Sequence, residues 1–235
     1  MKLVIKNLKK NFEKKEVLKD ITFTFENGKI YGLLGRNGAG KTTLFNCINE
    51  DIEIDSGEFF IEENGISRKL ISDDIGYVIS TPVVPEFLTG REFLKFFIDI
   101  NKSKIKDLKT IDEYFEFLKI EFEDRDKVMK DYSHGMKNKM QMLINIIANP
   151  NILLLDEPLT SFDVVVADEM KRTLKELKQN HILIFSTHIL ELATDLCDEI
   201  VILSNGTLEL IKKDDLNVQD FKEKIISSLR GETNV

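Results

Sequence analysis

The sequence predicts an α/β fold in which a parallel sheet is joined to an N-terminal antiparallel β-subdomain and an α-helical insert. Three observations support this prediction. Residues from Leu3 to Gly35 mostly alternate between apolar and polar and are rich in β-branched types. The stretch from about Phe87 to Ala148 has helical periodicity, and residues from Asn151 to Ser186 follow a strand, helix, strand pattern.

The first part of the chain predicts strands separated by tight turns. Asn27-Gly28 is a turn signal between strands at Ile21 to Phe25 and Ile30 to Leu34. Further strands are predicted at Gly57 to Ile61 and Ile75 to Ile79, with a turn at Asn64-Gly65. We therefore expect antiparallel strands beside a buried sheet.

The insert predicts helices that begin at two capping boxes. Thr89 is followed three residues later by Glu92, and Thr110 is followed in the same way by Glu113. The first helix places apolar residues on one face, and the second does the same; these are Phe93, Phe96, Phe97 and Ile100, then Tyr114, Phe115 and Leu118.

The last third predicts a parallel βαβ unit and a hairpin. Continuous apolar strands at Asn151 to Leu155 and Ile182 to Ser186 enclose a helix from Val164 to Gln179. Asn205-Gly206 marks a hairpin, and Val218 to Leu229 predicts a short helix. We expect one domain over residues 1–212, with the insert at about 87–148, and a short helical tail over 213–235.

Composition excludes several classes of protein. Hydrophobic residues make up 42% and charged residues 31% of the 235, which favours a folded chain over a disordered one. The net charge of -8 argues against a nucleic-acid partner. We expect no export signal and no membrane helix, because apolar runs stop far short of about 20 residues. Cys47 and Cys197 indicate core thiols rather than disulfides.

One glycine-rich segment fits the pattern G-x-x-x-x-G-K-[ST] and predicts a loop that binds a nucleoside triphosphate. It follows a predicted strand and precedes a predicted helix from Thr42 to Ile48. Backbone N–H groups and the helix N-terminus would hold the phosphates, Lys41 would reach the β- and γ-phosphates, and the Thr42 hydroxyl would bind Mg²⁺. The nucleotide-binding residues are Gly35, Arg36, Asn37, Gly38, Ala39, Gly40, Lys41, Thr42 and Thr43.

Two carboxylates follow the buried strand of the second half. Asp156 and Glu157 lie where an open α/β sheet presents its ligands. Asp156 is the candidate Mg²⁺ ligand, acting through water. Glu157 is the candidate for orienting or deprotonating the water that attacks the γ-phosphate.

Between these motifs lies Tyr132-Ser133-His134-Gly135-Met136, and here the sequence resembles the ATP-binding cassette (ABC) ATPases, whose signature is Leu-Ser-Gly-Gly-Gln. The resemblance covers nearly the whole chain, from Leu3 to about Ile211. It implies a P-loop NTPase core within an L-shaped ABC nucleotide-binding domain, with ATP and Mg²⁺ as cofactors. Ser133 and Gly135 keep the signature, while Tyr132, His134 and Met136 depart from it.

The resemblance also implies roles for further residues. Ser161-Phe162-Asp163 looks like the family's D-loop at a dimer interface, and His188 matches the histidine that contacts the γ-phosphate. Phe12 matches the aromatic residue that stacks on adenine, although a core position is the alternative.

One departure concerns the metal site. Where the family has a glutamine that helps to bind Mg²⁺, this chain has the shorter Ser80. Water could fill the gap, Thr81 or Glu86 could substitute, or hydrolysis could be slower.

As the resemblance implies, two cassettes pair head to tail around ATP and drive a separate integral-membrane permease from the cytoplasmic face of the membrane, as peripheral subunits. The second cassette is another copy or a related subunit. Phe87 to Phe97 and the loop from Ser80 to Pro85 would dock the permease, although for most of these phenylalanines we favour the alternative of a place in the core of the insert. The permease is expected to be a bacterial exporter of drugs, peptides or lipids. The alternative is a regulatory cassette with little hydrolysis.

A GTPase is disfavoured because Asn101-Lys102-Ser103-Lys104 lacks the required aspartate, and DNA-repair relatives are disfavoured by the short insert.

Overall fold

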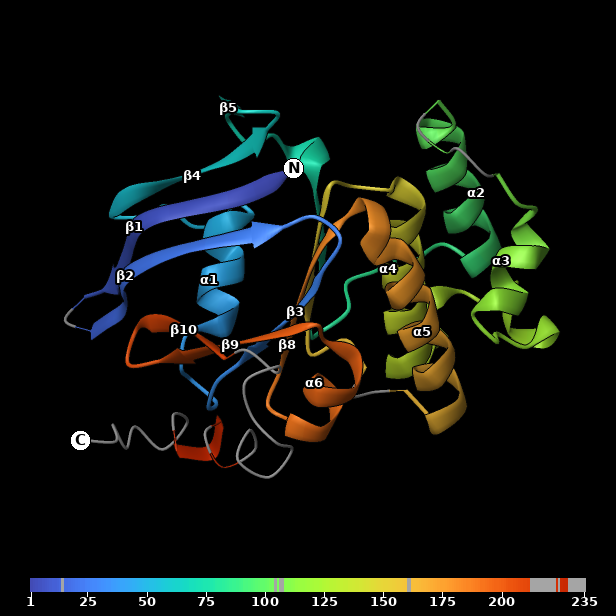
Figure 1. Cartoon of the computed structure of the whole chain (residues 1–235). Coiled ribbons are helices and arrows are strands. Elements are labelled where there is room, and N and C mark those ends of the chain that lie inside the picture. The colour runs from blue at the N-terminus through green and yellow to red at the C-terminus, as the bar shows by residue number, and fades with distance from the viewer. Residues whose placement is uncertain are drawn as a thin grey trace.

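The computed structural model of the chain contains two β-sheets and a group of helices, arranged as two arms (Figure 1). It describes residues 1–13, 15–103, 105, 108–159, 162–211, 223 and 225–227. The antiparallel sheet and helix α1 lie in one arm, and the helical insert forms the end of the other. The predicted architecture of a β-subdomain, a mainly parallel sheet and a helical insert is confirmed.

The smaller sheet is antiparallel and has the strand order β2-β1-β4-β5. The sequence forms it because apolar side chains alternate along β1 and β2, so that one face of the sheet packs on the core. The turn between β4 and β5 uses Asn64 and Gly65, whose φ values of 52° and 78° suit a tight hairpin. The strands are β1 (Lys2–Phe12), β2 (Lys15–Glu26), β4 (Ser56–Glu63) and β5 (Ile66–Arg68).

The larger sheet has the strand order β10-β9-β3-β8-β7-β6, and only β10 is antiparallel to its neighbour. Its inner strands β3, β7 and β8 are buried along their whole length, as expected for strands covered on both faces. The strands are β3 (Ile30–Leu34), β6 (Ile75–Val78), β7 (Ile152–Asp156), β8 (Ile182–Thr187), β9 (Glu199–Ser204) and β10 (Thr207–Ile211).

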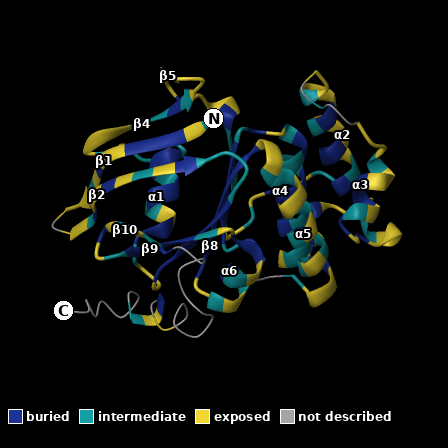
Figure 2. Ribbon diagram, in the orientation of Figure 1, coloured by how far each residue is buried: buried dark blue, intermediate teal, exposed yellow. Residues whose placement is uncertain are grey.

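Helices cover both faces of the parallel sheet and divide the buried residues into two clusters (Figure 2). One cluster joins α1 to the antiparallel sheet, and the other joins the helical insert to the far face of the parallel sheet. The helices are α1 (Lys41–Ile48), α2 (Gly90–Asn101), α3 (Ile111–Phe117), α4 (His134–Ala148), α5 (Val164–Leu177) and α6 (Leu190–Leu196), with 3₁₀ turns at Ser72–Asp74, Phe122–Asp124, Met129–Asp131 and Lys178–Asn180.

Both predicted capping boxes begin helices of the insert. The hydroxyl of Thr89 accepts from the backbone N–H of Glu92, and Thr110 does the same with Glu113. The expected core position of the phenylalanines on the first helix is wrong in part: Phe93 is buried, but Phe96 is 58% exposed, and Ile100 on the same apolar face is 61% exposed. Only half of that face meets the core of this chain.

The C-terminal segment falls mostly outside the described residues. The predicted helix from Val218 to Leu229 lies there, and of it the structure describes Glu223, which is helical, and the helical residues 225–227, with Ile225 buried. Both cysteines are buried, as expected for core thiols. Among the described residues, no helix combines the length and the apolar character that crossing a membrane requires.

Candidate nucleotide-binding site

A cleft of about 510 Å³ opens at the carboxyl ends of β3, β6 and β7. This is the edge of an open α/β sheet where ligands bind. The cleft brings together residues from the glycine-rich loop, the strand ends and the antiparallel sheet. Its lining is Phe12, Lys15, Val17, Asn37, Gly38, Gly40, Lys41, Thr42, Thr43, Ser80, Asp156 and Glu157.

The glycine-rich loop wraps around the start of α1. Gly38 and Gly40 have φ values of 79° and 107°, which side chains rarely adopt, and a Cβ at Gly40 would lie 2.8 Å from the Val17 side chain. The Lys41 ammonium folds back and donates to the carbonyl of Gly35 at 2.8 Å. Burial lowers the pKa of Lys41, while the charges of Glu157 and Asp156 oppose that change. The loop therefore holds a buried cation beside backbone donors, as a phosphate site requires.

Three residues of the predicted loop do not line the cleft. Arg36 is exposed, and Ala39 is half-buried. Gly35 packs closely against strand β9 and leaves no room for a side chain, because a Cβ there would lie 2.8 Å from the carbonyl oxygen of Leu203.

The carboxylate of Asp156 lies at the end of β7, where the chain leaves the sheet. Its Oδ2 accepts a hydrogen bond of 2.7 Å from the Thr42 hydroxyl, and its Oδ1 accepts one from the Ser186 hydroxyl. Strand β8 delivers Ser186 because Asp156 and Ser186 are direct partners in the parallel ladder. The side chain of Asp156 is thus fixed by helix α1 on one side and by strand β8 on the other.

Glu157 turns away from the strand in a left-handed conformation, with φ 52°. Its carboxylate oxygen Oε1 lies 2.9 Å from Nδ1 of His188. The two residues follow the neighbouring strands β7 and β8, so the parallel ladder brings them to the same edge. His188 does not line the cleft itself but is joined to it through Glu157.

The antiparallel sheet contributes one wall of the cleft. The Phe12 ring is 46% exposed, which is unlike a core phenylalanine. Lys10 places its ammonium 5.2 Å from the centre of that ring. Sequence reasoning missed Lys15 and Val17, which also line the cleft. The available signal was that both residues follow Phe12 within five positions, and in the structure Lys15 is the ladder partner of Phe12.

The three candidates for replacing the family's glutamine lie in different surroundings. Ser80 lines the cleft after β6. Glu86 instead forms an ion pair of 2.7 Å with Lys137 on α4, and this hydrogen bond lowers its pKa. Thr81 is exposed and does not line the cleft. Of the three, Ser80 alone contributes to the lining of the cleft.

The signature and D-loop residues cap helices away from the cleft. Ser133 precedes α4 and its hydroxyl accepts from the backbone N–H of Met136 at 3.2 Å. Asp163 precedes α5 and accepts from two backbone N–H groups at 3.0 Å, which lower its pKa. Gly135 lies in the first turn of α4. Ser161 lies outside the described residues.

Comparison with known proteins decides the family. The model of the family described as ABC transporter matches residues 18–160, which is more than half of the chain. The chain belongs to the ABC transporter family. Similar proteins include the ABC transporter ATP-binding protein MJ1023 of Methanocaldococcus jannaschii, which is 36% identical over 87% of this chain and 75% of its own length. The ATP-binding protein YdbJ of Bacillus subtilis is 33% identical, with 88% of this chain and 68% of its own length covered.

Solved structures agree on the fold. A structure described as the ATP-binding subunit of an ABC transporter superposes with a TM-score of 0.81, covering 96% of this chain and 100% of the other at 24% identity. A dimeric structure of the ATP-binding cassette MJ0796 bound to ADP and Pi has a TM-score of 0.74, covering 89% and 98% at 20% identity. The chain therefore has the fold of an ABC nucleotide-binding domain.

The donor atoms of the cleft suit a hard cation. Thr42 and Asp156 present oxygen atoms side by side, and Ser80 adds a hydroxyl to the same cleft. Mg²⁺ prefers oxygen ligands and keeps several of its waters, so few protein ligands are needed. The residues present therefore fit Mg²⁺.

Proposed function

We propose that this chain is the ATP-hydrolysing subunit of an exporter, pairing head to tail with a second cassette and driving a separate permease at the cytoplasmic face of the membrane. The observation that carries this proposal is the division of the site. The cleft gathers the phosphate loop and the carboxylates, whereas Ser133 and Asp163 lie outside it. One chain thus holds half of an ATP site, and a second cassette supplies the other half.

The start of α4 is built to meet a phosphate from across such an interface. Ser133 is exposed, and the helix behind it has 15 residues whose dipoles point their positive end toward Ser133. The similar cassette MJ0796 is described as a dimer bound to ADP and Pi. ATP would join the two halves, and loss of the γ-phosphate would release them.

Each cleft residue has a chemical part in this proposal. Lys41 and the backbone of the loop hold the phosphates. Glu157 orients or deprotonates the attacking water, and His188 holds that carboxylate while facing the γ-phosphate. Phe12 stacks on the adenine ring. Mg²⁺, held by Thr42 and Asp156 with help from Ser80, would neutralise charge on the phosphates.

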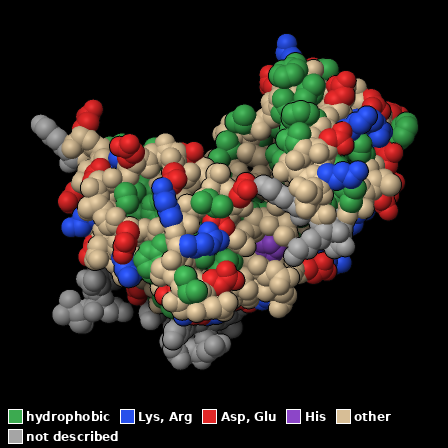
Figure 3. All heavy atoms as spheres, turned by 90° about the horizontal axis from the view of Figure 1, so that it is seen from above, with side chains coloured by type: hydrophobic (Ala, Val, Ile, Leu, Met, Phe, Trp, Pro, Cys, Tyr) green, Lys and Arg blue, Asp and Glu red, His purple; other side chains and the backbone are tan. Residues whose placement is uncertain are grey.

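Exposed hydrophobic side chains of the insert support a membrane partner. Phe87 is 81% exposed, Val83 in the preceding loop is 70% exposed, and Phe96 and Ile100 on α2 are 58% and 61% exposed. In the view from above, hydrophobic side chains gather in a band on the lobe toward the helical insert (Figure 3). A patch of this kind marks an interaction site, and we assign it to the permease. Identification of the integral-membrane protein that co-purifies with this chain would name that partner, and recovery without one would contradict it.

Substitution of Glu157 tests the proposal. Glu157→Gln keeps the shape of the side chain but removes the base, so phosphate release should fall by about 10²-fold or more. ATP binding persists, and a dimer should accumulate in ATP. Phosphate release and size-exclusion chromatography measure the two effects. Glu63→Gln, the same change of charge at an exposed residue at the end of strand β4, is the matched control and should alter neither.

The presence of Ser80 where the family has a longer, Mg²⁺-binding glutamine favours a second candidate function. In that case the chain binds ATP and regulates a partner with little hydrolysis. Phosphate release by the wild-type chain together with its membrane partner separates the two functions. No release under those conditions would contradict the transport-coupled function, and release that Glu157→Gln abolishes would exclude the regulatory one.

A further inference from the structure

We propose that Ser186 is a positioning residue for ATP hydrolysis, because its hydroxyl fixes Asp156 and Glu157 at the same time. The inference rests on the roles of those two carboxylates in the proposed function. Ser186 lies in β8, two residues before His188, and it is fully buried at 0% exposure. A buried hydroxyl at the end of an apolar strand requires hydrogen-bond partners, and both of its partners belong to the catalytic edge.

The hydroxyl group uses its donor and its acceptor in opposite directions. It donates to Oδ1 of Asp156 and accepts from the backbone N–H of Glu157 at 3.1 Å. Because Ser186 occupies Oδ1, the other oxygen of Asp156 remains for the Thr42 hydroxyl at 2.7 Å. The orientation of the Asp156 carboxylate, and with it the oxygen that faces the cleft, is therefore set from strand β8.

The second contact holds an unfavourable backbone conformation. Glu157 has φ 52°, a left-handed conformation in which a side chain other than glycine is strained. Its N–H is shared between the carbonyl oxygen of Ser186 at 3.2 Å and the hydroxyl of the same residue. This conformation directs the carboxylate of Glu157 to His188. Loss of the hydroxyl would leave the bend with one weaker backbone contact.

His188 comes directly after the same strand, so Ser186 is linked to both sides of the contact between Glu157 and His188. The ladder places Ser186 directly opposite Asp156, and His188 follows two residues later. Hydrogen bonds in such a buried network align groups to a fraction of an ångström, and small misplacement of a catalytic group costs rate. Ser186 forms no direct hydrogen bond with the described residues of the phosphate loop and reaches Thr42 only through Asp156, so nucleotide binding should depend on it little.

A set of three variants tests this role. Ser186→Ala removes the hydroxyl. Ser186→Thr and Ser186→Val have side chains of the same shape, but threonine keeps the hydroxyl and valine has a methyl group in its place. We expect kcat to fall at least tenfold in the alanine and valine variants, with KM and the affinity for a fluorescent ATP analogue changed less than twofold. The threonine variant should retain at least five times the kcat of the valine variant.

Thermal unfolding of each variant separates positioning from packing. Threonine and valine fill the buried site equally, so the added methyl group affects both melting temperatures alike, and a merely structural role predicts equal kcat values. Equal kcat in that pair, or a Ser186→Ala kcat within twofold of wild type, would overturn the proposal. If the Glu157→Gln variant hydrolysed ATP at the wild-type rate, both the role of Glu157 and this proposal would be refuted. If Glu157→Gln lost hydrolysis as expected but Ser186→Ala hydrolysed ATP at the wild-type rate, only the positioning role of Ser186 would be refuted.

Discussion

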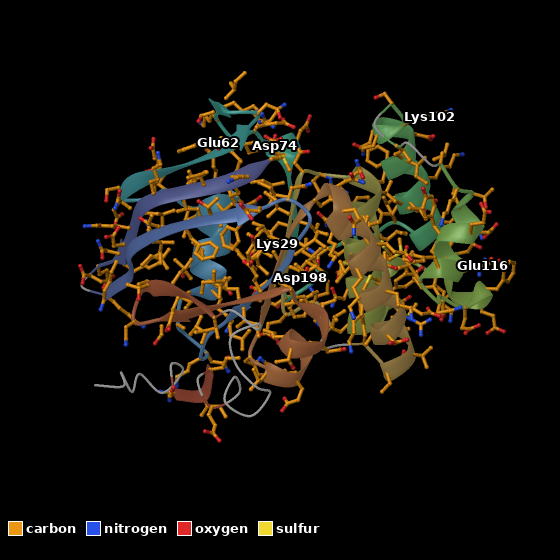
Figure 4. All side chains as sticks on the ribbon, viewed as in Figure 1. Lys29, Glu62, Asp74, Lys102, Glu116 and Asp198 are labelled. Atoms are coloured by element: carbon orange, nitrogen blue, oxygen red, sulfur yellow. The ribbon has the colours of Figure 1, made fainter. Side chains whose placement is uncertain are left out.

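At the residue scale, Asp74 shows how one buried carboxylate joins three segments of the chain. It lies beside the end of the antiparallel sheet, in the 3₁₀ turn that follows β5 (Figure 4). Arg68 holds it in a bidentate ion pair at 2.6 and 2.7 Å, and Asn151 donates to it at 2.7 Å. The backbone N–H of Ile71 completes the set. A carboxylate this deeply buried is stable only with such partners, so Asp74 links β5 to the start of the central strand β7.

The Asp74 network predicts a loss of stability in acid. The hydrogen bonds from Arg68 hold the pKa of Asp74 below its ordinary value, so its contribution is present above the unfolded pKa of about 3.9 and is lost as the pH falls through the folded value. Asp74→Asn should lower the unfolding free energy by about 2 kcal/mol at pH 7. Urea unfolding between pH 3 and 7 measures both effects. A difference from wild type that does not shrink in acid would contradict the assignment.

At the element scale, the start of α2 is locked to the signature segment by a tyrosine and a glycine. The Tyr132 hydroxyl donates to the carbonyl of Asp124 at 2.9 Å, and its pKa is raised to about 12, mainly by burial. A side chain at Gly90 would collide with that hydroxyl. The family's leucine has no such hydroxyl, so the departure at Tyr132 ties the signature segment to the base of the helical insert.

This lock predicts a specific coupling between two substitutions. Gly90→Ala should destabilise the chain by about 1–3 kcal/mol because the new methyl group overlaps the Tyr132 hydroxyl. Tyr132→Phe alone loses one hydrogen bond, worth about 1 kcal/mol. In the double variant the overlap is partly relieved, so the double variant should be destabilised by less than the sum of the two single variants. A double-mutant cycle of urea unfolding measures this, and strict additivity would exclude the contact.

At the scale of the whole molecule, the sequence predicts what local pattern determines and misses what depends on register. The phosphate loop and the strand before Asp156 follow from neighbouring residues. Ser186 and Lys15 were missed because their contacts depend on which strand residues lie opposite each other. The phenylalanines of α2 were expected in the core because periodicity cannot distinguish burial within the chain from burial against a partner. Phe96 is exposed in this chain, as is Ile100 on the same face.

The exposed face of the insert leads to a prediction about assembly. Phe87 and Phe96 are 81% and 58% exposed, so replacing both by serine should leave the folding of the isolated chain almost unchanged. If the insert docks a permease, the double variant should bind ATP normally but lose at least tenfold in recovery with the membrane subunit, because the apolar contact area is removed. Ile66→Ser, at a site 72% exposed on β5 of the antiparallel sheet, is the matched control. Ile66→Ser should co-purify as the wild type does. Equal recovery of the double variant and the control would exclude the insert as the docking surface.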